Sequence, residues 1–128
     1  MWSRRELLGA VWLLPVGDRL STKKASREVL LLRTRLAGYR YYSADSLYPY
    51  MKLGEELSLR REPYNPYDHK AVEVLWKGHK IGYLPREDNS VIAQLMDRGE
   101  NLRAIISELA GTERYWERIR IEVYLVVS

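Results

Sequence analysis

Apolar and polar residues alternate along much of the chain after residue 28, a pattern typical of strands that bury one face. Six segments show the alternation or a continuous apolar run: 29–36, 56–61, 71–76, 80–84, 102–109 and 118–127. The turn at Lys77-Gly78 joins 71–76 and 80–84 into a predicted hairpin. The pattern therefore predicts six short strands.

Glycine and proline divide these segments. Gly38 follows the first strand, and we expect the strand to continue past a bend at this residue into 39–42. The segment 62–68 is predicted to be a loop, because Pro63 and Pro66 interrupt the hydrogen bonding that a strand needs.

One helix of roughly ten residues is predicted after Pro85, which ends the preceding strand. Gly99 is placed to end this helix. Four apolar residues recur at the spacing of one helix face: Val91, Ile92, Leu95 and Met96. Six strands with one main helix indicate a mainly β domain, built as a small closed or nearly closed barrel that leaves few sheet edges unpaired.

The first 25 residues differ from this pattern. Arg4 and Arg5 precede an apolar run at 7–16, which is typical of an export leader and is similar to a twin-arginine signal. As a helix, the run is too short to cross a hydrocarbon core of roughly 30 Å. We therefore predict a leader at 1–25, one domain at 26–128, and an exported, periplasmic location. No small-x-small cleavage motif follows the run, so a buried N-terminal helix or strand in a cytoplasmic protein stays open as the alternative.

Length and composition exclude several classes of protein. A chain of 128 residues can bury one hydrophobic core, and the absence of cysteine excludes disulfide frameworks, thiolate zinc sites and iron–sulfur clusters. The formal net charge is +4, but residues 1–25 carry five of the 21 basic side chains and two of the 17 acidic ones. The rest is nearly neutral, so any nucleic-acid binding must depend on a local site.

Catalytic motifs are missing from the sequence. It contains no Gly-rich phosphate loop, no nucleophile elbow and no His-x-x-x-His pair. The histidines are His69 and His79, and His69 adjoins Asp68 in the predicted loop, where neighbouring side chains seldom converge on one metal or proton. We predict a binding protein with no catalytic residue, no cofactor and no metal site.

Aromatic, basic and amide side chains are concentrated in three segments, 38–42, 61–71 and 81–87. The second segment contains Arg-Glu-Pro-Tyr-Asn-Pro-Tyr-Asp, and the third contains Gly-Tyr-Leu-Pro-Arg-Glu. In this order and spacing, with a strand that begins at Ala71, these strings resemble the HIRAN domain. That family occurs at the N-terminus of some DNA-remodelling ATPases and as small stand-alone bacterial proteins. The resemblance extends over residues 29–127.

The resemblance implies an OB-like β-barrel and, as in the eukaryotic remodelling proteins, capture of the 3′ end of single-stranded DNA. Tyr41 and Tyr67 would stack on terminal bases, and Asp68 would accept a hydrogen bond from the 3′-hydroxyl. Arg40 and Arg86 would contact phosphates. The full set that the resemblance places in the nucleic-acid site is Arg40, Tyr41, Tyr67, Asp68, Tyr83 and Arg86. Hydrolase activity and zinc binding in larger members belong to other domains, since this sequence has no P-loop and no cysteine.

Each segment also has a purely structural interpretation. Tyr41 and Tyr42 are neighbours on the expected strand, so they point to opposite faces and one of them belongs to the core. Asn65 and Asp68 can hydrogen-bond their own loop backbone in a rigid turn. Gly82 can mark close backbone packing. The same tyrosine-rich groove could instead bind an exported peptide, glycan or other polymer, which stays open as the alternative function.

Overall fold

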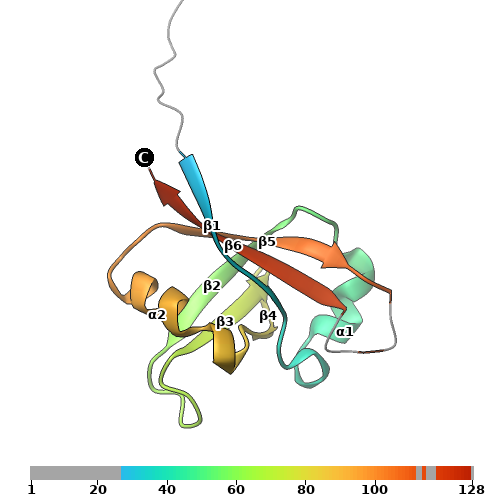
Figure 1. Ribbon diagram of the computed structural model, residues 1–128. Coiled ribbons are helices and arrows are strands. Elements are labelled where there is room, and N and C mark those ends of the chain that lie inside the picture. The colour runs from blue at the N-terminus through green and yellow to red at the C-terminus, as the bar shows by residue number, and fades with distance from the viewer. Residues whose placement is uncertain (1–26, 112–113, 115–117, 128) are drawn as a thin grey trace, which may run out of the picture.

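The computed structural model describes residues 27–111, 114 and 118–127, which form a six-stranded antiparallel sheet with one main helix (Figure 1). The predicted leader at 1–25 lies outside the described residues. Within them, no helix is long and apolar enough to cross a membrane. The strands are β1 (Arg27–Arg35), β2 (Glu56–Glu62), β3 (Ala71–Trp76), β4 (His79–Tyr83), β5 (Leu102–Leu109) and β6 (Ile119–Val127).

The strand order is β1-β6-β5-β2-β3-β4, and β2 belongs to both halves of the sheet. Its first residues, Glu56 and Leu57, pair with β5, whereas its remainder from Ser58 pairs with β3. The layer of β1, β6 and β5 therefore crosses the layer of β2, β3 and β4, with α2 at one end and α1 at the other (Figure 1). This arrangement confirms the prediction of a mainly β domain with six strands and one main helix.

The sheet is not closed into a continuous barrel. Its outer strands, β1 and β4, are joined through an isolated bridge between Ala37 and Tyr83. Each backbone N–H of this pair donates to the carbonyl of the other, at 2.8 Å from Ala37 and 2.9 Å from Tyr83. A single bridge replaces the full ladder that a closed barrel would have, and it holds the end of β4 against the chain that leaves β1.

The hydrophobic core fills the space between the two layers. Thr34 and Leu36 are buried in the first strand and its continuation, as the alternation predicts, and Leu57 is buried in β2. All six residues of β3 are buried, because this strand is covered on both faces. Burial of the apolar side chains among them is the main driving force for packing the layers, whereas Thr34 and Glu73 are buried polar residues. The largest fully buried apolar side chains include Leu36, Ile81, Leu84, Ile92, Ile106, Ile119 and Ile121.

The prediction that β1 continues as a strand through 39–42 is wrong. The chain turns instead into the 3-10 helix η1 (Tyr39–Tyr41), followed by α1 (Ala44–Leu47) and η2 (Tyr48–Tyr50). Gly38 adopts φ 80°, a left-handed conformation that glycine tolerates without steric cost, and this ends the extended path. Tyr39 and Ala44 are both buried, so tertiary packing stabilises these short turns.

The predicted helix is present as α2 (Ser90–Asp97), eight residues long and preceded by the 3-10 turn η3 (Arg86–Asp88). Ile92 and Ala93 are buried, but Val91 is 60% exposed and does not belong to the packed face as predicted. Gly99 follows the helix with φ 81°, which confirms its predicted place at the helix end.

Candidate functional site

A cleft of about 250 Å³ lies where the β2–β3 loop meets the end of β4 and the start of η3. The residues that line it are Ala37, Tyr42, Asn65, Tyr67, Asp68, Ala71, Tyr83, Leu84 and Arg86. Four of the six predicted site residues are therefore brought together: Tyr67, Asp68, Tyr83 and Arg86. Arg40 and Tyr41 do not line the cleft, but they lie in η1, between the lining residues Ala37 and Tyr42 in the chain. Tyr41 is 82% exposed.

Asn65 organises the β2–β3 loop, which projects from the two crossed layers (Figure 1). Its Oδ1 accepts hydrogen bonds from the backbone N–H groups of Tyr67, at 2.8 Å, and of Asp68, at 3.2 Å. Its Nδ2 donates to Oε1 of Glu62 at 3.0 Å. The loop is thus the rigid turn that its composition predicts, and that turn forms one wall of the cleft.

The carboxylate of Asp68 is held in a fixed orientation at this wall. Oδ1 accepts the Lys70 backbone N–H at 2.9 Å, and Oδ2 accepts Nδ2 of the buried Asn89 at 2.8 Å. Burial acts to raise the pKa of Asp68, but these two hydrogen bonds and the nearby charges of Arg86 and Arg61 outweigh it and lower the pKa. Asp68 is therefore ionised at neutral pH, and each carboxylate oxygen retains capacity for a further donor.

Arg86 links η3 to the loop. Its Nη2 donates to the backbone carbonyl of Tyr67, so the guanidinium is held against the loop segment that carries the most exposed ring of the cleft. Tyr67 itself is 81% exposed. A guanidinium carries five N–H donors, so this contact leaves other donors for a bound anion.

The opposite wall is an aromatic pair with a lysine between the rings. Tyr42 and Tyr83 meet edge to face, with ring centroids 5.7 Å apart. Nζ of Lys80 lies 4.5 Å from the Tyr42 centroid and 4.4 Å from the Tyr83 centroid, a cation–π arrangement. The same ammonium donates to the Tyr83 hydroxyl at 2.7 Å and lies 3.5 Å from the buried carboxylate of Glu73. This wall is therefore held by charge as well as by packing.

Tyr83 connects the two walls. Its hydroxyl donates to Oε1 of Glu62 at 2.7 Å, and Glu62 in turn holds Asn65. Burial, together with the Glu62 carboxylate, raises the pKa of Tyr83 against the opposing effect of Lys80. The phenol therefore stays protonated and keeps donating this hydrogen bond at neutral pH.

Two glycines permit the close packing behind the cleft. A Cβ on Gly82 would overlap the carbonyl oxygen of Ala37 and lie 2.9 Å from the Leu36 side chain. A Cβ on Gly38 would lie 3.1 Å from the ring of Tyr42. The packing interpretation of Gly82 is therefore confirmed, and Gly38 allows the Tyr42 ring to lie against the backbone.

Sequence reasoning missed Tyr42 and Lys80 as parts of this site. The expected strand at 39–42 placed Tyr41 and Tyr42 on opposite faces, but η1 changes their directions and places Tyr42 in the cleft. Lys80 carried no signal beyond its place in a hairpin strand, because its contacts with Tyr42 and Glu62 join residues distant in sequence.

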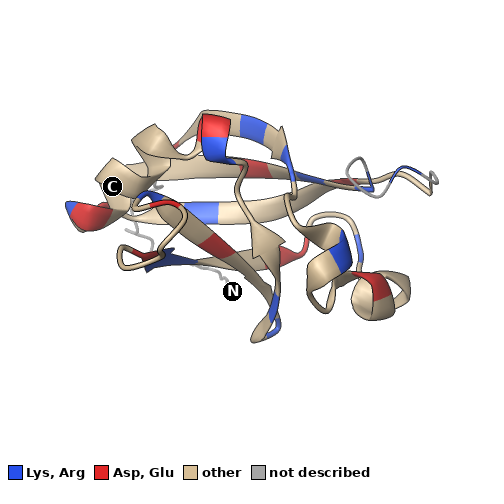
Figure 2. Cartoon of the chain, turned by 90° about the horizontal axis from the view of Figure 1, so that it is seen from below, with Lys and Arg blue, Asp and Glu red and all other residues tan. Residues whose placement is uncertain are grey.

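The described part of the chain shows no broad surface of one charge. Acidic and basic residues are interspersed over the strands and turns (Figure 2), and many are paired, as in the contacts Arg33–Glu122 and Arg103–Glu28. In the part of the chain that the structure describes, no group of three or more His, Asp or Glu side chains could hold a metal ion. Binding at this cleft must therefore depend on the few side chains described above.

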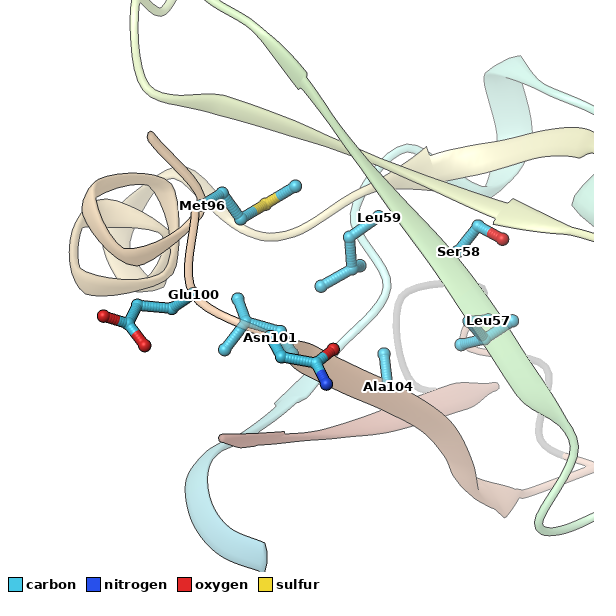
Figure 3. Close-up of a pocket in the computed structure, with 8 residues that line it drawn as sticks. Leu57, Ser58, Leu59, Met96, Glu100, Asn101 and Ala104 are labelled. Atoms are coloured by element: carbon cyan, nitrogen blue, oxygen red, sulfur yellow. The ribbon is translucent and has the colours of Figure 1, made fainter. Parts of the chain in front are cut away.

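A larger hollow of about 390 Å³ lies between α2 and strands β2 and β5. Met96 from α2 and Leu59 from β2 extend into it, and Glu100 and Asn101 lie at its edge (Figure 3). None of the six predicted site residues lines this hollow, and it has no basic side chain. The smaller aromatic cleft is therefore the better candidate for a functional site.

The crossed antiparallel layers form a small OB-like domain that carries a tyrosine-lined cleft at its surface. The HIRAN domain family model matches residues 29–128, and the chain belongs to that family.

Known relatives share the fold and part of the sequence. A crystal structure of a protein from Lactobacillus plantarum has a TM-score of 0.69 and 26% identity, and the match covers 81% of this chain and all of that one. The crystal structure of the HIRAN domain of human HLTF has a TM-score of 0.60 and 24% identity, with 79% of this chain and 80% of that chain covered.

Two curated relatives are much longer proteins. The rabbit helicase-like transcription factor is 34% identical over 88 residues, which is 66% of this chain. A rice Fanconi-associated nuclease 1 homolog is 35% identical over 83 residues, which is 62% of this chain. The matched region spans 8% of each of these relatives.

Proposed function

We propose that the cleft binds single-stranded DNA and captures its free 3′ end. The observation that carries this proposal is the ionised carboxylate of Asp68, held by Asn89 and the Lys70 backbone, beside the exposed ring of Tyr67 and the guanidinium of Arg86. The family resemblance and the names of the curated relatives, a helicase-like factor and a nuclease, agree with a DNA ligand.

Tyr67 stacks on a terminal base in this proposal, and Tyr41 stacks on a base from the η1 side. Both rings are more than four-fifths exposed, so they are accessible to a ligand. Stacking of one base on an aromatic side chain is worth roughly 1–3 kcal/mol and tolerates every base. Arg86 and Arg40 contact the backbone phosphates, which adds a salt-dependent contribution.

Asp68 gives the site its preference for a free 3′ end over a 3′-phosphate or a continuing strand. A 3′-hydroxyl donates a hydrogen bond to the carboxylate, whereas a 3′-phosphate or a continuing phosphodiester brings a second negative charge against it. The pKa of Asp68 is lowered, so this discrimination operates at neutral pH. The Tyr42 and Tyr83 wall limits the cleft on the other side.

The site is proposed to bind without catalysis. The carboxylate of Asp68 already accepts two hydrogen bonds from the protein, and His69 in the same loop lies against the carbonyl of Pro63, with Nδ1 at 3.3 Å. Both side chains therefore hold the loop in place, which is a structural role in a binding site.

The test is fluorescence polarisation with the full chain and one labelled oligonucleotide that ends in either a 3′-hydroxyl or a 3′-phosphate. We expect the 3′-hydroxyl form to bind at least about tenfold more tightly, which corresponds to one charged hydrogen bond. Equal affinity for the two forms would exclude end capture. Absence of binding to both would exclude a single-stranded DNA ligand and favour the peptide, glycan or polymer alternative.

A further inference from the structure

Tyr64 is the most exposed large side chain with an apolar body among the described residues, at 94%. It lies in the β2–β3 loop, three residues before Tyr67, on the other side of Asn65. It does not line the cleft assigned above to DNA binding. Its ring is therefore accessible, and it is not used by the proposed 3′-end site.

The backbone that carries Tyr64 is rigid. On one side Pro63 has a fixed φ, and on the other Asn65 donates its backbone N–H to the Glu62 carbonyl at 3.1 Å and its side chain to the Glu62 carboxylate at 3.0 Å. The same turn presents Tyr67, through the contact of its N–H with Asn65. A ring presented from a fixed backbone loses less conformational entropy when a ligand orders it.

Tyr64 borders a second hollow, of about 430 Å³, that adjoins the first cleft. It is lined by residues 61–66 and includes the faces of Pro63, Tyr64 and Pro66. Asn65 lines both hollows, so they meet at this residue. Because Tyr64 and Tyr67 are three residues apart in this loop, their Cα atoms lie within about 11 Å of each other, so a strand bound at Tyr67 can extend toward the ring of Tyr64.

We propose that Tyr64 is a second stacking platform, which binds one further unpaired base of the same DNA strand, on the 5′ side of the nucleotides held at Tyr67 and Asp68. This inference rests on the proposed function of the first cleft. The hollow presents the apolar faces of Pro63, Tyr64 and Pro66, which suits the face of a base. An extended peptide would instead add to a sheet edge through main-chain hydrogen bonds, and Tyr64 lies in a loop.

The proposal predicts a dependence on the length of the oligonucleotide. The probes are labelled oligothymidines of about three and about nine nucleotides with a free 3′-hydroxyl, since the sites of OB-like folds extend over several nucleotides. Substitution Tyr64→Ala should weaken binding of the longer probe about tenfold and change binding of the shorter one less than about twofold. Tyr67→Ala should weaken both. Fluorescence polarisation with the full chain measures the affinities of the parent and both variants for each probe.

Three further variants separate stacking from other effects. Tyr64→Phe keeps the ring and should bind the longer probe like the parent, whereas Tyr64→Leu keeps an apolar side chain without the ring and should behave like Tyr64→Ala. The matched control is Tyr50→Ala, because Tyr50 is 68% exposed in η2 and lines neither hollow. It should leave both affinities unchanged.

The outcomes distinguish this inference from the proposed function. If Tyr67→Ala weakens both probes and Tyr64→Ala weakens neither, the second platform is excluded and the first cleft remains the binding site. Equal weakening of the two probes by Tyr64→Ala also excludes a separate platform. If the parent binds neither probe, both proposals fail. Equal thermal unfolding midpoints for Tyr64→Ala and the parent are expected, since an exposed side chain contributes little to the core.

Discussion

The hydroxyl of Tyr83 donates a hydrogen bond to Oε1 of Glu62 at 2.7 Å, and this contact joins the two walls of the aromatic cleft. The same carboxylate oxygen accepts the side-chain amide of Asn65, which shapes the loop that carries Tyr67 and Asp68. Lys80 stabilises the arrangement from the other side, through the Tyr83 hydroxyl and an ion pair of 3.7 Å with Glu62. The partly buried carboxylate of Glu62 is therefore one of the groups that position the loop, together with Asn89 and Arg86.

Glu62 gives the protein a component of stability that depends on pH. Burial acts to raise the pKa of Glu62, but hydrogen bonds from Tyr83 and Asn65, with the charge of Lys80, hold it below its ordinary value of 4.5. A depressed folded-state pKa contributes stability above the unfolded value, and that stability is lost as the pH falls through the folded value. The free energy of unfolding of Glu62→Gln should therefore change less than that of the parent between about pH 6 and about pH 3.

Urea denaturation at several pH values measures this difference. The control is Glu100→Gln, because Glu100 is an exposed glutamate just after α2 and away from the network. Identical pH dependence in Glu62→Gln and the parent would contradict the role assigned to Glu62.

Asp68 is expected to control discrimination between the ends of DNA. Asp68→Asn removes the negative charge that repels a 3′-phosphate, so the affinities for 3′-hydroxyl and 3′-phosphate oligonucleotides should become equal within about twofold. Fluorescence polarisation gives both constants. The control is Asp97→Asn, because Asp97 pairs with Arg61 outside the cleft lining. A variant at Asp68 that folds and keeps the full preference for the hydroxyl would exclude the assigned role.

Arg86 should contribute one phosphate contact. Arg86→Gln is expected to reduce the slope of log affinity against log salt concentration by about one, while Arg86→Lys keeps most of that slope. Arg33→Gln is the matched control, since Arg33 is exposed on β1 and paired with Glu122. An unchanged slope in Arg86→Gln would show that Arg86 only anchors the Tyr67 carbonyl.

Gly82 should be essential for the bridge that joins β1 and β4. Gly82→Ala places a Cβ against the carbonyl oxygen of Ala37, and relief of this overlap requires a backbone shift that costs about 1–3 kcal/mol of unfolding free energy. Gly111→Ala is the control, because a Cβ there meets no atom within 4 Å. Chemical denaturation of both variants measures the difference, and equal stabilities would contradict the close packing at the bridge.

Much of the fold was predictable because it depends on local patterns. The alternation in 29–36 and 118–127 identified β1 and β6, and the two prolines of the 62–68 segment identified the loop between β2 and β3. Gly99 ends α2 as its position predicts. These features follow from the period of side chains on a strand or helix and from backbone restrictions, which short stretches of sequence contain.

The path after Gly38 was not predictable in this way. Three tyrosines in four residues favour a strand by propensity, yet Tyr39 is 2% exposed in the core and the chain forms η1. Burial of Tyr39 against distant elements outweighs the local preference. The direction of Tyr42 into the cleft is a consequence of that packing.

The sequence by itself determined the six strands, the one main helix, the rigid loop and the family to which the chain belongs. Only the tertiary structure decided that Tyr42, Lys80 and Glu62 share a site with Tyr67 and Asp68, and that β1 and β4 meet through one bridge. The physical reason is that strand patterns depend on neighbouring residues. The cleft depends also on contacts between segments distant in the chain, such as the Tyr83–Glu62 and Asn89–Asp68 hydrogen bonds, each across 21 residues, and these form when the layers pack.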